Sequence, residues 1–227
     1  MQATSVIGAA TLALIVTRWL AQLGLNRLNQ RYVRAHSGAV PAAFSEAIDP
    51  ATYAKTVDYT LAKGRFSQVE DTVHAAVLLA VIGSGVLPWA FAEFSGRFGD
   101  SAWAMAAFLF SVTVALALPG LPFDWHAQFR LEERFGFNTS TPRLWWIDRA
   151  KGLLVAVVLG YPLLVLVLKL VEWSGPWWWL GAWGCVLGFQ VLMLVLAPIV
   201  ILPLFNKFTP LPPGPLRDRL QIGRAHV

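Results

Sequence analysis

Five apolar runs dominate this sequence, and each is long enough to cross a lipid bilayer. An α-helix rises ~1.5 Å per residue, so about twenty apolar residues cross the ~30 Å hydrocarbon core. Only 14% of the residues are charged, compared with about a quarter in soluble domains. We therefore expect an all-α, polytopic membrane protein with about five transmembrane helices and a cytoplasmic helical loop. The expected spans are about 4–25, 73–94, 101–121, 152–171 and 180–205.

Lysine and arginine are distributed unevenly among the segments between these runs. There are six in residues 26–72, one in 95–100, five in 122–151, none in 173–179 and three in 206–221. Because cytoplasmic loops carry the excess of basic residues, this alternation places the N-terminus outside. The basic loops and the C-terminal tail are then cytoplasmic. The expected location is a multi-pass position in the membrane, assigned to a bacterial inner membrane.

Several polar residues lie in or near the apolar runs. Arg18 is interpreted as snorkelling to the interface, with a buried functional charge as the alternative. His74 is interpreted as an interfacial polar group, with a ligand role as the alternative. Lys169 and Glu172 are three residues apart on a helix and are expected to pair. Residues 51–70 are predicted to form a separate surface or interfacial helix.

A polar segment at residues 121–151 separates the third apolar run from the fourth. A helix is expected over its first half and should end at Gly136, a residue that readily adopts the left-handed conformation of a C′ position. Phe137 could then fold back on Leu131. A second helix should follow, with Thr141 as its N-cap and Pro142 as its first residue.

Glu132 and Glu133 occupy the last turn of the first of these helices, where the helix dipole disfavours anions by ~0.3–1 kcal/mol. Arg130, Arg134 and Arg143 are candidate partners that would compensate, as is a basic group outside this chain. Three interpretations remain open: a solvated helix end, a corner used for docking or gating, and direct catalysis by the two carboxylates.

Recognisable catalytic and metal-binding motifs are absent from the sequence. None of the histidines (His36, His74, His126 and His226) is followed by glutamate or by a second histidine four residues later, so no HExxH site is encoded. GxSxG, Walker and GxGxxG motifs are also missing. The single cysteine, Cys185, excludes an internal disulfide and a CxxC site. The modest net charge of +5 does not indicate nucleic acid as a partner.

Two segments carry a resemblance to a known family, the CAAX prenyl protease 1 family of integral-membrane zinc metalloendopeptidases. The first is similar to its EERFGFNxxTPxxxxxD segment, and the second to the exit of its fifth span, at 202–211. The matching residues are Glu132, Glu133, Arg134, Phe135, Gly136, Phe137, Asn138, Thr141, Pro142 and Asp148, followed by Asn206, Lys207 and Phe208.

The resemblance implies that this chain is the five-helix N-terminal region of such an enzyme. Family members carry an HExxH zinc motif further along the chain and cleave near the C-terminus of prenylated or other proteins. The resemblance thus implies Zn²⁺ as the cofactor of the full-length parent, with no catalytic residue and no zinc ligand in this chain. The implied partners are the lipid bilayer, the missing C-terminal catalytic part and a peptide or prenylated-protein substrate. The present residues would form a chamber wall and a cytoplasmic corner.

The last six residues, 222–227, resemble the translation of a sequencing-adapter read-through. We therefore expect residues 1–221 to be the natural part of the chain, and the parent to continue beyond Gln221. Two alternatives remain. A non-catalytic five-span scaffold would end near Gln221, and a small transporter would need charges along a path at the membrane midplane.

Overall fold

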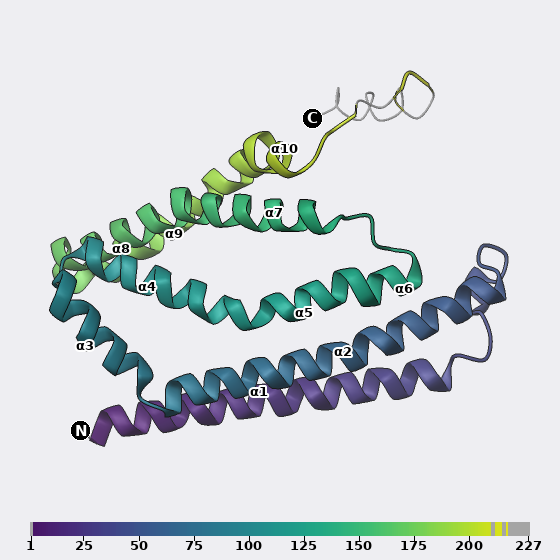
Figure 1. Cartoon of the computed structure of the whole chain (residues 1–227), viewed down its shortest axis with the longest axis horizontal. Helices are drawn as coiled ribbons and strands as arrows, with labels where there is room; N and C mark the ends of the chain where they lie inside the picture. The colour runs from purple at the N-terminus through teal and green to yellow at the C-terminus, as the bar shows by residue number, and fades with distance from the viewer. Residues whose placement is uncertain (1, 210–211, 215–216, 218–227) are drawn as a thin grey trace. The chain divides into compact units, whose positions relative to one another are not determined.

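The computed structural model describes residues 2–209, 212–214 and 217, and its regular structure within these ranges is entirely helical (Figure 1). The chain divides into two compact units, Met1–Thr141 and Pro142–Val227. The first unit contains α1 (Gln2–Ala35), α2 (Pro50–Gly83), α3 (Val86–Phe98), α4 (Ala102–Ala117), α5 (Leu121–His126) and α6 (Glu133–Phe135). The second unit contains α7 (Pro142–Val155), α8 (Tyr161–Trp173), α9 (Trp178–Leu196) and α10 (Leu202–Phe205). The expected all-α class is confirmed.

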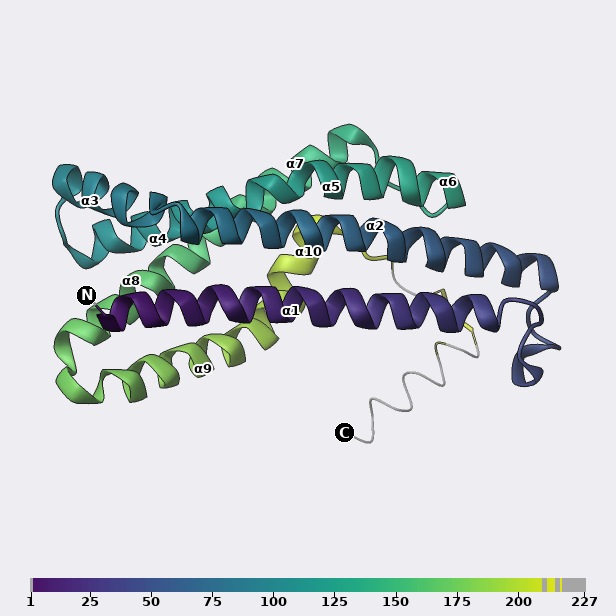
Figure 2. The same ribbon diagram turned by 90° about the horizontal axis from the view of Figure 1, so that it is seen from below.

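The α1 and α2 helices form a long antiparallel pair in the first unit (Figure 2). The indole Nε1 of Trp19 donates a hydrogen bond to Thr72 Oγ1 at 3.1 Å. Further along the pair, the backbone of Gly64 lies against Gln30, whose side chain is only 6% exposed. A Cβ atom at position 64 would be 3.2 Å from Gln30 Nε2, so a glycine is what allows this close approach.

The helix expected at residues 51–70 is present, but it is the first part of α2, which continues without a break to Gly83, and not a separate element. The expected span 73–94 is instead interrupted at its centre. Gly85 has a φ of 74°, a left-handed conformation that favours glycine. The chain therefore bends by 59° between α2 and α3.

Four helical stretches of the described residues are long and apolar enough to cross a membrane, and the bent pair of α2 and α3 gives a fifth. The four are Val6–Ala35, Ala102–Phe135, Pro142–Trp173 and Gly175–Phe205. They contain 30 to 34 residues. At ~1.5 Å per residue they exceed the ~30 Å hydrocarbon core by roughly half its thickness. The first helix of the polar segment is thus an extension of the span that precedes it.

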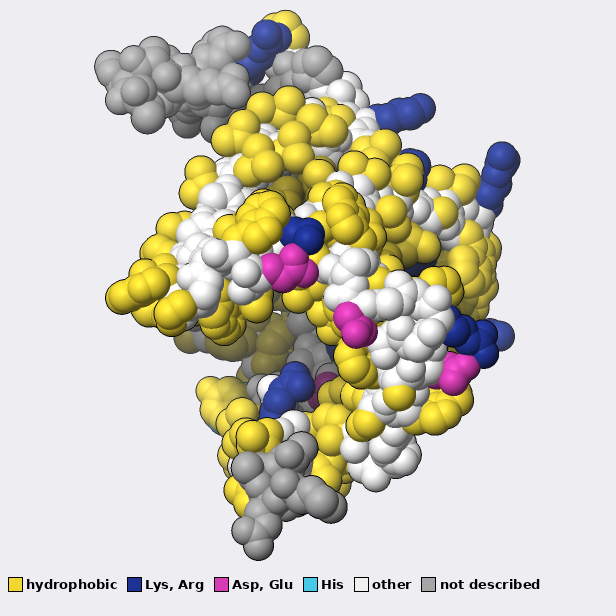
Figure 3. Space-filling view, turned by 90° about the vertical axis from the view of Figure 1, so that its left-hand side faces the viewer, with side chains coloured by type: hydrophobic (Ala, Val, Ile, Leu, Met, Phe, Trp, Pro, Cys, Tyr) yellow, Lys and Arg dark blue, Asp and Glu magenta, His cyan; other side chains and the backbone are white. Residues whose placement is uncertain are grey.

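Most large apolar side chains face outward rather than into a protein core. Leu194 in α9, for example, is 76% exposed. The space-filling view shows hydrophobic side chains over much of the face that it draws (Figure 3). The buried apolar side chains among the described residues are Ala102, Ala106, Phe135, Trp145 and Val165. Such a surface is stable where lipid chains surround it, so the chain is a multi-pass integral membrane protein.

In the second unit, α8 and α9 pack together as a helical hairpin. Wide π-helical turns at Ala156–Gly160 and Ala197–Ile201 lie just before Pro162 and Pro203. Proline lacks an N–H and crowds the carbonyl four residues earlier, so a widened turn relieves the strain. At the end of α8, Lys169 Nζ lies 2.7 Å from Glu172 Oε2, which confirms the expected pair.

The N-terminus of α2 is capped by Asp49, which gives a first testable prediction. Its carboxylate accepts hydrogen bonds from the Thr52 hydroxyl and from the amides of Thr52 and Ala51, and these bonds lower its pKa. A lowered folded pKa stabilises the cap above the unfolded pKa, and this stabilisation is lost as the pH falls through the folded pKa. Hydrogen-exchange protection of Ala51 and Thr52 should therefore hold above about pH 4 and fall below it.

The matched control for this prediction is Asp49→Asn, since asparagine is an equally good N-cap that does not titrate. In that variant the protection of the two amides should not change over the same pH range. Protection that falls equally in both proteins would show that the titration of Asp49 is not the cause.

Candidate functional site

The EERFGFN segment folds as a helix end followed by a tight turn. The Gly136 backbone adopts a φ of 78°, its amide donates to Glu133 O at 3.0 Å, and the Phe137 amide donates to Glu132 O at 2.9 Å. These two bonds satisfy carbonyls that the helix leaves unpaired. The expected C′ role of Gly136 is confirmed. We call this turn, with the residues bonded to it, the corner: Tyr59, Lys63, Gln128 and residues 132–140.

A π-helical turn at Ala127–Glu132 leads directly into the corner. A π turn adds one residue to the helical repeat and so rotates the side chains that follow it. This turn has no proline within it or directly after it, whereas both π-helical turns of the second unit are associated with proline. The turn ends at Glu132, and it therefore sets the direction in which the side chains from Glu133 onward leave the helix.

The Glu132 carboxylate is compensated by side chains of α2. Tyr59 donates its hydroxyl hydrogen to Glu132 Oε1 at 2.6 Å, and Lys63 Nζ lies 3.8 Å from the same oxygen. Lys63 also donates to the Tyr59 hydroxyl at 3.0 Å. Within the first unit, the expected partners Arg130 and Arg134 do not supply the compensating charge, which Lys63 provides. The helix end is thus tied to a segment distant in the sequence.

Aromatic rings pack around the same tyrosine. The ring of Tyr59 meets Phe135 edge-on at 5.2 Å between centroids and Phe137 at 5.0 Å. Phe135 is 6% exposed, whereas Phe137 is 52% exposed. The Arg134 guanidinium lies 5.5 Å from the Phe135 ring centre, and Lys55 Nζ lies 5.8 Å from that of Phe137. Packing and hydrogen bonding therefore fix the corner together.

The Asn138 side chain holds the chain that leaves the turn. Its Nδ2 donates to Glu133 Oε2 at 2.8 Å, while its Oδ1 accepts from Gln128 Nε2 at 2.6 Å and from the Ser140 amide at 2.9 Å. Both carboxylates of the corner are thus engaged in structural bonds. These bonds tie the end of the helix to the segment that follows Gly136.

The remaining signature residues lie at the junction of the units and in the second unit. The α7 helix begins at Pro142, directly after Thr141, as predicted. Lys151 Nζ lies 3.6 Å from Asp148 Oδ1 and donates to the Leu204 carbonyl oxygen at 2.9 Å. Lys151 thus links the two signature segments within this unit. After α10, the residues Asn206, Lys207 and Phe208 are exposed.

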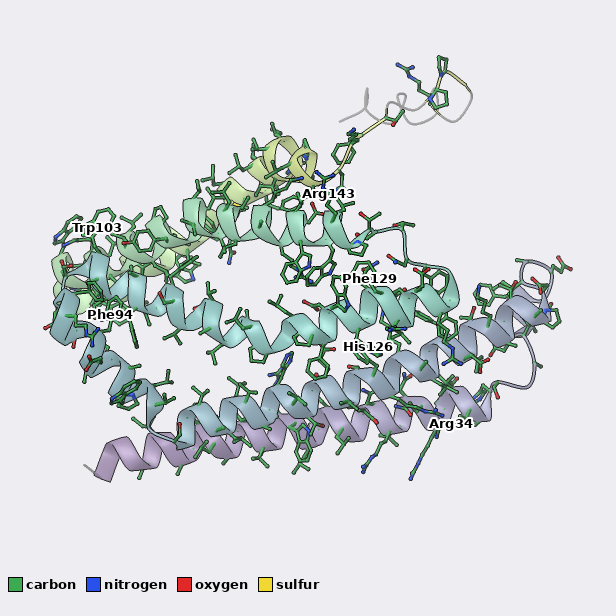
Figure 4. All side chains as sticks on the ribbon, viewed as in Figure 1. Arg34, Phe94, Trp103, His126, Phe129 and Arg143 are labelled. Atoms are coloured by element: carbon green, nitrogen blue, oxygen red, sulfur yellow. The ribbon has the colours of Figure 1, made fainter. Side chains whose placement is uncertain are left out.

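Two other polar residues noted in the sequence lie in the first unit. His126 stacks on Phe66 of α2, with ring centroids 5.4 Å apart (Figure 4). His74 and Arg18 line a cavity of about 430 Å³ among α1, α2, α4 and α5, together with Glu70 and Asp71. Within the described residues, no group of three or more His, Cys, Asp or Glu side chains could hold a metal ion.

Sequence reasoning missed the α2 side of the corner. Tyr59 and Lys63 are four residues apart and therefore share one helix face. The four-residue spacing predicts that the two side chains lie together, but it does not predict that they contact Glu132. Gln128, Ser140 and Lys151 were missed for the same reason, because their partners depend on how the chain folds back.

The Tyr59 hydroxyl gives a second prediction. Tyr59→Phe removes the donor to a half-buried carboxylate and should lower the free energy of unfolding by about 1 kcal/mol after allowance for solvent. The measurement is SDS titration of the detergent-solubilised chain. Tyr53→Phe is the matched control, since its hydroxyl donates to the carbonyl of His36 at an exposed site. An equal or larger loss in the control would contradict the role given to Tyr59.

Comparison with known proteins identifies the family. A sequence model described as the CAAX prenyl protease N-terminal region, with five membrane helices, matches residues 29–207. The chain belongs to this family. The expected resemblance is therefore confirmed. The corner contains the EERFGFN part of the first segment that carries the resemblance, and α10 begins the second segment.

Individual relatives agree with this family assignment. The probable CAAX prenyl protease 1 of Schizosaccharomyces pombe is 34% identical over 199 residues, covering 80% of this chain and 41% of the relative. A rice CAAX prenyl protease 1 homolog is 33% identical over 171 residues, covering 72% and 40%. The crystal structure of Saccharomyces mikatae Ste24p matches with a TM-score of 0.84 at 27% identity, covering 94% of this chain and 51% of that one.

The chain thus spans about half, or less, of the length of these relatives. All three relatives are eukaryotic, so the expected bacterial inner membrane stays a prediction.

Proposed function

We propose that this chain is the membrane-embedded N-terminal part of a zinc metalloendopeptidase that cleaves C-terminal peptides from prenylated or other membrane-associated proteins. The observation that carries the proposal is the corner. The EERFGFN segment folds as a helix end in which the carboxylates of Glu132 and Glu133 both accept hydrogen bonds from neighbouring side chains. Such a corner can position another part of the protein, and it lacks a catalytic set of its own.

The residues present do not fit the zinc centre that the family implies. The sequence has no HExxH motif, and no group of three or more His, Cys, Asp or Glu side chains among the described residues could hold a metal ion. We therefore assign the zinc ligands to the part of the parent beyond this chain. In this proposal the present residues bind and orient the substrate. The polar cavity at Arg18 and His74 forms part of a chamber wall.

The proposed topology follows from the basic residues. The corner and the connection between α1 and α2 lie on the cytoplasmic side, where lysine and arginine are concentrated. Arg134 and Phe137 are both exposed at the corner. Exposed arginine and aromatic side chains suit a protein contact, and we assign the docking of the missing catalytic part to the corner.

The proposal predicts that the purified chain, residues 1–221, binds no stoichiometric zinc and cleaves no prenylated CAAX peptide. Zinc content is measured by elemental analysis after gel filtration, and cleavage by mass spectrometry of the peptide. The full-length S. pombe relative, handled in the same way, is the positive control. Zinc-dependent proteolysis by the chain alone would overturn the assignment of the catalytic ligands to a missing part.

A further inference from the structure

An open groove of about 600 Å³ runs between α1 and α2. It shares Trp19 with the polar cavity but none of the cavity's charged side chains, and no residue of the corner lines it. One end of the groove is basic, with Arg27 from α1 and Arg65 from α2. The other end is apolar and includes Leu23, Val69 and Val73. The groove thus changes from cationic to apolar along its length.

The register of the helix pair places the two arginines at the same level. Trp19 is bonded to Thr72, and Asn26 and Gln30 lie against Gly64, so the two helices run past each other in a fixed antiparallel alignment. In that alignment Arg27 lies level with Arg65, and Leu23 lies level with Val69. One helical turn, ~5.4 Å, separates the two levels.

Polar groups at the basic end have no protein acceptor among the described residues. Neither Arg27 nor Arg65 takes part in an ion pair there, and both side chains are exposed. Gln68 also lines the groove, although its Nε2 atom is buried beneath the surface. The two guanidinium groups are therefore available to an anionic ligand.

If the first span ends near residue 25, as the sequence predicts, the basic end of the groove lies at the depth of lipid headgroups. The apolar part of α1 ends at Leu25, and Arg27 follows half a turn later. Val69 is 57% exposed beside the groove, as expected of a side chain that faces lipid. A basic site directly beyond a span attracts anionic headgroups.

We propose that this groove binds one anionic phospholipid, with its phosphate between Arg27 and Arg65 and an acyl chain along Leu23, Val69 and Val73. Charge complementarity and the change from basic to apolar lining select a phospholipid over a free anion. The site does not depend on the proposed peptidase activity.

The test reconstitutes the chain in nanodiscs of equal phosphatidylglycerol and phosphatidylcholine, and native mass spectrometry then counts the lipids retained after release into detergent. The chain should retain one phosphatidylglycerol in preference to phosphatidylcholine. Arg27→Gln and Arg65→Gln should each lower that retention by about fivefold, consistent with the loss of one lipid-facing charge. Equal retention of both lipids by the unchanged protein would overturn the proposal.

The matched control is Arg31→Gln, which removes an exposed arginine from α1 one turn beyond Arg27 and outside the groove. Retention should be nearly unchanged in this variant. A loss equal to that of Arg27→Gln would mean that basic residues attract the membrane surface diffusely, without a site.

A second variant tests the apolar end without changing charge. Val69→Trp fills the groove beside Leu23 and should also abolish selective retention, while circular dichroism stays unchanged. Undiminished retention in Val69→Trp would contradict the proposal that an acyl chain lies in the groove. If inorganic phosphate displaces the lipid, the two arginines bind a free anion, and the proposal of a lipid site is wrong.

Discussion

Phe135→Ala is expected to lower the free energy of unfolding by about 3–5 kcal/mol, the cost of emptying the site of a buried aromatic ring. Phe135 is 6% exposed and meets the Tyr59 ring edge-on. Its removal would leave a cavity between α6 and α2, and the bond between Tyr59 and Glu132 would lose its support. SDS titration in mixed micelles, followed by tryptophan fluorescence, measures the change.

Phe137→Ala is the matched control for this prediction, because Phe137 contacts the same tyrosine from an exposed position. Its loss should be clearly smaller, since lipid or water already reaches about half of the ring. If the two variants lose equal stability, the packing of Phe135 is not what holds the corner against α2.

Gly64→Leu should have the second-largest effect, because it places a side chain where α1 and α2 are in contact. The added Cβ atom alone would meet Gln30 Nε2 at 3.2 Å and Asn26 Oδ1 at 3.4 Å. The helices must separate or shift, at a cost of about 1–3 kcal/mol. The same SDS titration measures the loss.

Gly24→Leu controls for the gain in helix propensity that any such change brings. Gly24 lies in α1 with open space at its Cβ position, so leucine there should be neutral or stabilising. Similar stability in Gly64→Leu and Gly24→Leu would show that the two helices are not held as closely as the structure places them.

Local features of the fold could be predicted from the sequence because they depend on neighbouring residues. Gly136 ends a helix through its own backbone freedom, and Pro142 begins one through its fixed φ. Lys169 and Glu172 meet because a helix brings positions three apart together. The long apolar runs gave the all-helical membrane class, since little else can satisfy the backbone in lipid.

Two features could not be predicted from the sequence. One depends on the direction in which the chain turns, and the other depends on a partner that is distant in the sequence. Hydropathy treated residues 73–94 as one span, yet the positive φ of Gly85 turns the chain by 59° there. The bond from Tyr59 to Glu132 joins residues 73 apart. The dipole argument showed that Glu132 needed a cation, but only the packing of α2 against the helix end shows that Lys63 supplies it.

Reading the natural coding DNA beyond Gln221 tests the central proposal most directly. The account predicts that the frame continues with residues other than those at 222–227, which lie outside the described part of the structure. It further predicts apolar helices and an HExxH motif downstream. A stop codon near Gln221, or a long extension without HExxH, would contradict a metallopeptidase parent and favour a non-catalytic membrane scaffold.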